Sequence, residues 1–148
     1  KDMKWKFVVV GKPPLQYARL GIEEYLKRLQ KYTAAELITV KNGTQDEEGD
    51  RLLKGSDGSY RIVFDERGES LDTQQLTRKI DELEMDGGCK LVSVLIGGAD
   101  GHSQEVKEAA DCIISLGKMT IQHELALLVA VEQIYRVYTI KRGEPYHR

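Results

Sequence analysis

The sequence contains few of the residues that form disulfides or hold metals. It has two cysteines and three histidines among 148 residues. Cys89 and Cys112 match neither a CxxC pair nor a zinc-ligand spacing, and apolar residues flank both, so we expect reduced cysteines in the core. His102, His123 and His147 are scattered, and no carboxylates accompany them at ligand spacing. We therefore expect no catalytic metal.

Long apolar runs and nucleotide-binding glycine motifs are also missing. No run approaches the roughly 18 apolar residues of a membrane-spanning helix. The first residues lack the apolar stretch and cleavage site of a signal peptide. We expect no membrane partner, a cytoplasmic location, and Met3 as the natural start behind two additional residues. Neither GxGxxG nor GxxxxGKS/T occurs, which disfavours dinucleotide oxidoreductases and P-loop NTPases.

The composition is that of one folded domain. With 41% hydrophobic and 31% charged residues, a chain of 148 residues can bury an ordinary core without disulfides or metals. No internal repeat, linker or low-complexity tract interrupts it. We expect a single domain over residues 1–148.

Charge is distributed unevenly along the chain. Residues 1–41 contain nine Lys/Arg and four Asp/Glu, residues 42–111 contain eight and seventeen, and residues 112–148 contain five and three. Local potential, rather than net charge, attracts a polyanion. If the two basic ends meet in the fold, they form a phosphate-facing patch, although charge runs are more often solvated surface.

Apolar periodicity predicts alternating strands and helices. The predicted strands are 5–10, 36–40, 61–64, 91–96 and 112–116, and the predicted helices are 15–29, about 47–53, 73–86, 103–110 and 123–140. This alternation predicts an α/β domain with a mainly parallel sheet and helices on both faces. The fully apolar segment 91–96 is expected at the centre of the sheet.

Ligands of open α/β sheets bind at the carboxyl ends of the strands, which selects the loops after the third, fourth and fifth predicted strands. Gly97 and Gly98 let a ligand approach bare backbone, although a tight turn alone also requires glycine. The loop 117–122 is long enough to surround an adenine-sized ring with main-chain amides and apolar side chains.

The C-terminal segment carries unusual chemistry for a chain end. The predicted helix 123–140 stops before Gly143, and Pro145, Tyr146, His147 and Arg148 follow. Chain ends are usually frayed and polar, whereas this one places a phenol, an imidazole and a guanidinium after a rigid proline. We interpret it as a functional tail, with an accidental surface tail as the alternative.

Several motifs in the second half of the chain occur in an order that resembles a known family. They are Leu95-Ile96-Gly97-Gly98, Leu116-Gly117-Lys118-Met119-Thr120, His123, Glu132-Gln133-Ile134-Tyr135-Arg136 and Gly143-Glu144-Pro145-Tyr146-His147-Arg148. Over essentially its whole length, the chain resembles the H-type ribosomal RNA large subunit methyltransferases of the SPOUT superfamily, which methylate N3 of a pseudouridine.

This resemblance implies a homodimer, a deep trefoil knot near the C-terminus, and S-adenosylmethionine as the methyl donor. The implied substrate is a pseudouridine of 23S ribosomal RNA within the 70S ribosome, and neither DNA nor a metal takes part. The implied donor-binding residues are Phe64, Gly97, Gly98, Leu116, Gly117, Lys118, Met119, Thr120, Ile121 and Gln122. The implied catalytic or substrate-binding residues are Arg136, Tyr146, His147 and Arg148.

The residue chemistry suggests roles within that site. N3 of the ring is an imide nitrogen that keeps its proton at neutral pH, so methyl transfer requires loss of the proton and stabilisation of negative charge. His147 is the candidate base, and Arg136 or Arg148 stabilises the ring or binds a phosphate. Tyr146 stacks on the nucleobase or donates a hydrogen bond to one of its carbonyls. Nothing in the sequence opposes the reverse assignment of the roles of Tyr146 and His147.

Some positions depart from the usual pattern of the family. Gln122 replaces a proline before His123, Leu127 replaces an arginine, and Asp100 and His102 alter the Gly-Gly loop. We expect His102 on the surface and a structural role for His123. The alternatives are a methyltransferase for another RNA nucleotide and a catalytically silent factor that binds RNA or the ribosome.

Overall fold

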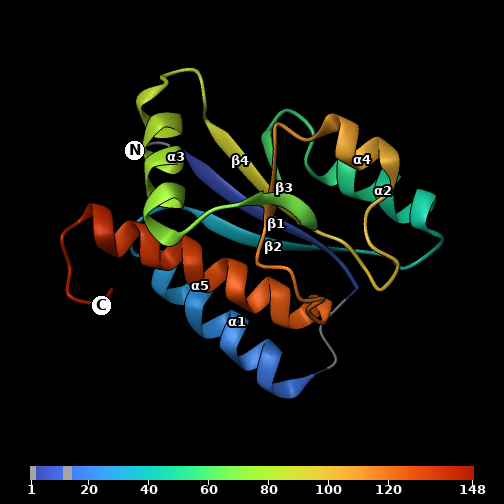
Figure 1. The fold of residues 1–148 in the computed structure, drawn as a ribbon, viewed down its shortest axis with the longest axis horizontal. Helices are drawn as coiled ribbons and strands as arrows, with labels where there is room; N and C mark the ends of the chain where they lie inside the picture. Colours follow the sequence, from blue (N-terminus) through green and yellow to red (C-terminus); the bar gives the residue numbers. More distant parts are fainter. Residues whose placement is uncertain (1–2, 12–14) are drawn as a thin grey trace.

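The computed structural model describes residues 3–11 and 15–148, and helices and strands alternate along it (Figure 1). The strands are β1 (Lys4–Val10), β2 (Ala35–Val40), β3 (Tyr60–Ser70), β4 (Leu91–Ile96) and β5 (Cys112–Ser115). The helices are α1 (Gln16–Leu29), α2 (Gln45–Gly55), α3 (Thr73–Met85), α4 (Gln104–Ala109) and α5 (His123–Lys141). The predicted order of elements is confirmed. The two residues before Met3, expected to be additional, lie outside the described residues.

The strands form one sheet in the order β2-β1-β4-β3-β5, and every pairing is parallel. β4 is the central strand, as its apolar sequence predicted. It pairs with β1 on one side and with β3 on the other, and five of its six residues are buried. Because the strands are parallel, their carboxyl ends lie along one edge of the sheet.

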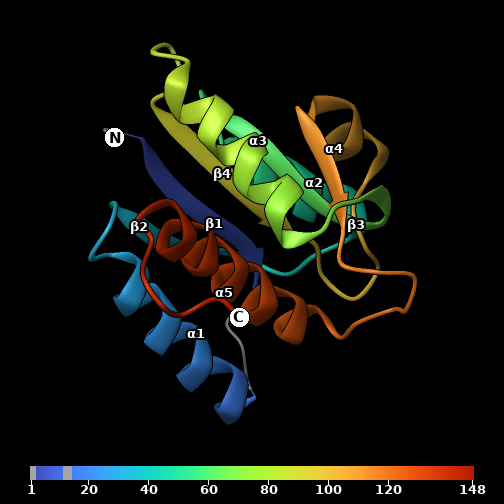
Figure 2. The same cartoon turned by 60° about the vertical axis from the view of Figure 1, so that its left-hand side comes forward.

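Helices cover both faces of the sheet (Figures 1 and 2). Successive residues of β1 point to opposite faces, so Trp5, Phe7 and Val9 join the larger core cluster with buried residues of α1, α3 and α5. Val8 and Val10 join a smaller cluster with residues of α2 and α4. The α/β class with helices on both faces is therefore confirmed, while the trefoil knot stays a prediction.

β3 continues to Ser70, so the prediction that this strand ends near Phe64 was wrong. Its pairing with β5 shifts between Phe64 and Glu69, and Ser70 then lies opposite Ser115. Gly68 permits this second stretch, because a Cβ there would lie 2.7 Å from backbone atoms of β5. The close backbone approach is a tertiary contact that strand periodicity does not contain.

The two basic ends of the chain meet where α1 packs beside α5 (Figure 2). The Arg28 guanidinium lies 5.2 Å from the ring centre of Tyr25 in α1 and 5.8 Å from that of Tyr135 in α5. α2 and α4 lie across the sheet from this pair. Parts of the basic segments 1–41 and 112–148 therefore lie side by side, as a basic patch would require.

The predicted cysteine state agrees with the structure, since Cys89 and Cys112 are unpaired and half-buried against the larger core cluster. Within the described part of the chain, no helix is both long and apolar enough to cross a lipid bilayer.

A buried hydrogen-bond chain joins the first strand to the last helix and gives a stability prediction. The Trp5 indole N–H donates to the Tyr138 hydroxyl at 2.9 Å, and that hydroxyl donates to Glu84 at 2.8 Å. Tyr138→Phe leaves the Trp5 N–H without its acceptor, so we expect a loss of about 1–3 kcal/mol of unfolding free energy in urea titrations.

Tyr60→Phe is the matched control for this prediction. The half-buried Tyr60 hydroxyl makes no hydrogen bond within residues 3–11 and 15–148, so its removal is expected to change stability by less than about 0.5 kcal/mol. Equal losses in the two variants would contradict the role of the Trp5–Tyr138 bond.

Candidate active site

A cavity of about 660 Å³ lies at the carboxyl ends of β3, β4 and β5, beside the first turn of α5. The strand register explains its position, because Phe64, within β3, lies level with Ile96 at the end of β4 and with Ile114 of β5. Nine of the ten expected donor-binding residues line it: Phe64, Gly97, Gly98, Leu116, Gly117, Met119, Thr120, Ile121 and Gln122. Lys118 belongs to the same loop but not to the cavity wall.

The glycines after β4 form a tight turn. Gly98 and Gly101 are bridged, with the Gly101 N–H donating to the Gly98 carbonyl at 3.0 Å. A Cβ on Gly97 would lie 3.0 Å from the Gly101 carbonyl carbon, whereas one on Gly98 would meet the Glu48 carboxylate at 2.9 Å. The turn therefore needs glycine for its own geometry at position 97.

The loop after β5 is held by its own polar contacts. The Gly117 N–H donates to Ser115 Oγ at 3.0 Å, and Gly117 has a φ of +139°, which favours glycine. The Thr120 hydroxyl donates to Glu66, in the stretch after Phe64, at 2.8 Å. Met119 is 81% exposed at the rim. These contacts tie two of the three predicted loops together.

The two departures beside this loop have structural explanations. The Gln122 side-chain oxygen accepts from the backbone N–H groups of Glu124 and Leu125, so it caps α5 at the position where the resemblance led us to expect proline. Leu127 is 2% exposed and belongs to the larger core cluster. Its apolar side chain fills the core at the position where the resemblance led us to expect an arginine.

His102 lines the cavity, so the expectation of a surface histidine was wrong. It is 5% exposed, and neither ring nitrogen has a hydrogen-bond partner among the described residues. Burial lowers the pKa of the ring, and the nearby Asp65 carboxylate only partly opposes this. His123, expected to be structural, also lines the cavity. Both histidines follow strands that end at the cavity, which is the signal that could have placed them there.

Carboxylates of the cavity wall were also missed by sequence reasoning. Asp65, Glu66 and Asp100 line it, and Lys107 lies 3.7 Å from Asp65. Asp65 and Glu66 directly follow Phe64, so their position after the apolar part of β3 was the available signal. In the part of the chain that the structure describes, no group of three or more His, Cys, Asp or Glu side chains can hold a metal ion.

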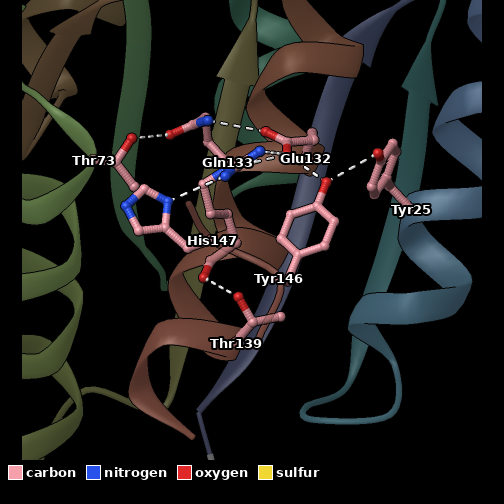
Figure 3. Close-up of polar contacts among 8 residues, drawn as sticks. Tyr25, Thr73, Glu132, Gln133, Thr139, Tyr146 and His147 are labelled. Atoms are coloured by element: carbon pink, nitrogen blue, oxygen red, sulfur yellow. Dashed lines mark hydrogen bonds and ion pairs between the residues drawn. The ribbon is translucent and has the colours of Figure 1, made fainter. Parts of the chain in front are cut away.

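Three of the four expected catalytic residues, Arg136, Tyr146 and His147, lie together in a second cluster (Figure 3). With Tyr25 and Glu132, which contact them, they form what we call the tail cluster. Glu132 Oε2 accepts from Arg136 Nη2 and from the Tyr146 hydroxyl, both at 2.7 Å. Arg136 Nη1 lies 3.1 Å from His147 Nδ1, and Tyr25 bonds to the Tyr146 hydroxyl at 3.0 Å. Sequence reasoning assigned no site role to Glu132 or Tyr25.

The surroundings of Tyr146 keep its phenol protonated. Burial raises its pKa, and the hydrogen bonds with Tyr25 and Glu132 raise it further. The Arg136 guanidinium stacks 4.7 Å from the centre of the Tyr146 ring. The pKa of Arg136 is raised mainly by its hydrogen bonds to Glu132. Tyr146 is consequently a hydrogen-bonding group and a stacking surface rather than an anion.

Within one chain, the expected donor-binding residues and the expected catalytic residues lie in different places. Arg136, Tyr146, His147 and Arg148 do not line the cavity, and Arg148 is exposed beyond the tail cluster. The cavity uses the start of α5, while the tail folds back onto its second half (Figures 1 and 3). The donor-binding prediction and the catalytic prediction thus describe two separate places on one chain.

The fold resembles that of solved RNA methyltransferases. The structure of a tRNA (m1G37) methyltransferase from Aquifex aeolicus superposes with a TM-score of 0.60 at 17% identity, covering 98% of this chain and 75% of that one. A likeness at this identity establishes the fold only.

Sequence comparison extends the likeness to a family. The family described as predicted SPOUT methyltransferases matches residues 3–147. A ribosomal RNA large subunit methyltransferase H from Thermus thermophilus is 45% identical over 99% of both chains. The protein of the same name from Deinococcus radiodurans is 40% identical, again over 99% of both. The chain therefore belongs to the ribosomal RNA large subunit methyltransferase H family of SPOUT methyltransferases.

Proposed function

We propose that this protein transfers a methyl group from S-adenosylmethionine to N3 of a pseudouridine in 23S ribosomal RNA within the 70S ribosome. The observation that carries the proposal is the cavity itself, because nine residues expected to bind the donor gather there from three separate loops. The family membership and the full-length similarity to enzymes named for the large ribosomal subunit support the substrate.

The cavity suits the donor in size and chemistry. Its volume of about 660 Å³ lies within the roughly 300–1,000 Å³ typical of small-molecule sites. Phe64, Leu116 and Ile121 offer apolar contacts to a purine and a thioether chain, while the carboxylates of Asp65 and Glu66 complement positive charge. When bound, S-adenosylmethionine supplies an electrophilic methyl group on its sulfonium.

A homodimer would bring the two parts of the site together. Large apolar side chains remain exposed on the paired helices: Tyr17 and Leu20 of α1 are 60% and 55% exposed, and Val129 of α5 is 39% exposed. A second copy covering this face would bury them and set the tail cluster of one chain beside the cavity of the other. Each active site would then contain residues of both chains.

The charge distribution fits an RNA partner. Basic segments from both ends of the chain adjoin through α1 and α5, the same helices that carry the tail cluster. Basic side chains near the tail would attract the phosphate backbone, while the site itself would select the base. Recognition would depend on the dimer surface and on RNA already folded in the ribosome.

The direct test is methyl transfer from labelled S-adenosylmethionine to 70S ribosomes that lack the modification. Isolated 50S subunits and free 23S RNA serve as parallel substrates, and mass spectrometry identifies the nucleoside. We expect N3-methylpseudouridine, formed best on 70S ribosomes. Label in another nucleotide would indicate a different target, and donor binding without any transfer would indicate a silent binding factor.

A glycine series tests the donor cavity. Gly97→Ala places a Cβ against rigid backbone of the turn, so we expect S-adenosylmethionine affinity in calorimetry to fall at least about tenfold, or 1.4 kcal/mol. Gly98→Ala meets side chains rather than backbone, the end of Glu48 at 2.9 Å and a Val10 methyl carbon at 3.4 Å, and should cost less. Gly87→Ala, which has no neighbour within 4 Å, is the control and should bind like wild type. Equal binding by all three would exclude this turn from the donor site.

A mixed dimer tests whether the tail serves the partner chain. One copy lacks residues 146–148 and the other carries Gly97→Ala, and the two are co-expressed with different affinity tags. If the tail acts across the interface, the purified mixed dimer has one complete site and about half of the wild-type activity. A tail acting on its own chain predicts that the mixed dimer is nearly inactive, like each parent dimer, when the donor concentration is held well below the dissociation constant of the Gly97→Ala variant.

A further inference from the structure

Glu132 is the centre of the tail cluster. Its Oε2 accepts from the Tyr146 hydroxyl and from Arg136 Nη2, each at 2.7 Å, and from Arg136 Nε at 3.2 Å. Its Oε1 accepts from Gln133, whose own side-chain oxygen accepts from Thr73 at the start of α3. Gln133 thus holds Oε1 of the carboxylate, while Oε2 orients the Arg136 guanidinium through two N–H groups.

The orientation of Arg136 determines the hydrogen-bonding state of His147. A guanidinium has N–H donors and no acceptor, so its 3.1 Å contact with His147 Nδ1 requires a lone pair on that nitrogen. In a neutral ring the single hydrogen then resides on Nε2. The outward function of the His147 ring is consequently donation by Nε2–H, because its only unprotonated nitrogen already accepts from Arg136.

We propose that His147 acts in catalysis as a hydrogen-bond donor through Nε2–H to a ring carbonyl beside N3, and not as the base, with Glu132 as the residue that positions Arg136 to enforce this. The proposal rests on the proposed function. The N3 lone pair forms the bond to the methyl carbon, the carbon–sulfur bond breaks, and sulfur keeps that electron pair. The N3 proton leaves to solvent water or hydroxide, and the donated hydrogen bond stabilises the negative charge on the carbonyl oxygen.

Three substitutions at position 147 distinguish a donor from a base. His147→Gln keeps an amide N–H and a carbonyl acceptor but takes up no proton at neutral pH, so single-turnover methylation of 70S ribosomes should fall by less than about tenfold. His147→Asn retains the acceptor for Arg136 and should fall between Gln and Phe. His147→Phe removes donor and acceptor and should lose about 10²–10³-fold. An equal loss of about 10²–10⁴-fold in Gln and Phe would establish the base instead.

The pH dependence supplies a second criterion. If the proton leaves to solvent, the rate of the chemical step rises about tenfold per pH unit between pH 6 and 8.5, in wild type and in His147→Gln alike. A base in the protein gives a plateau above its own pKa, and that plateau disappears in the Gln variant. A plateau found only in wild type would overturn the proposal.

Nitrogen-15 NMR of histidine-labelled protein tests the geometry without activity. The expected spectrum has His147 Nδ1 unprotonated and Nε2 protonated, with the signals assigned from the His147 variants. Glu132→Gln should loosen Arg136, give a mixture of the two tautomers and lower the methylation rate, with donor affinity unchanged. A predominant Nδ1–H tautomer in wild type would refute the Arg136 contact.

Failure of the proposed function is distinguishable from failure of this inference. If wild type binds no S-adenosylmethionine or forms no N3-methylpseudouridine, the proposed function fails whatever the variants do. If wild type forms the product and the Gln variant is as inactive as Phe while still binding the donor, only the role of His147 is overturned.

Discussion

The parallel pairing of β3 with β4 on one side and β5 on the other is the constraint on which the cavity depends. It places Phe64 level with Ile96 and Ile114, so three loops leave the sheet at one edge. A slip by one residue would turn every side chain of the strand to the opposite face. The two core clusters oppose such a slip, because Ile62 belongs to one cluster and Val63 to the other. Burial of apolar side chains thus also positions the polar loops.

α5 contributes residues to the cavity, to the tail cluster and to the core against the sheet. Its first turn closes the cavity, its middle carries Glu132 and Arg136, and its last turns pack beneath the sheet through Val137 and Tyr138. A helix is stiff over this length, so the cavity and the tail cluster keep a defined spacing within one chain. That spacing keeps the two half-sites apart within one chain, and it is the reason why we propose a symmetric pair of chains.

Much of the cavity could be predicted from the sequence, whereas the contacts around the tail could not. Periodicity located the strands, and the carboxyl-end rule for parallel sheets then selected the loops that line the cavity, including Gly97 and residues after Leu116. His102 was misplaced because a polar residue after a glycine turn is usually exposed, and its burial comes from neighbouring strand ends. The extension of β3 was missed because Gly68 acts through a backbone approach to β5. The pairing of Glu132 with Arg136 is four residues apart on one helix and was open to prediction, whereas the bond from Tyr146 to Glu132 depends on the path of the tail.

The sequence by itself determined the order of helices and strands, the parallel sheet and the loops that form the cavity. These depend on local apolar spacing and on general rules of sheet topology, both of which are read along the chain. Only the tertiary structure decided which groups donate and which accept at the C-terminus. The tautomer of His147 follows from a guanidinium eleven residues away along the chain, held by a carboxylate that also binds Tyr146. Hydrogen-bond direction is a property of such contacts in space, and no spacing in the sequence encodes it.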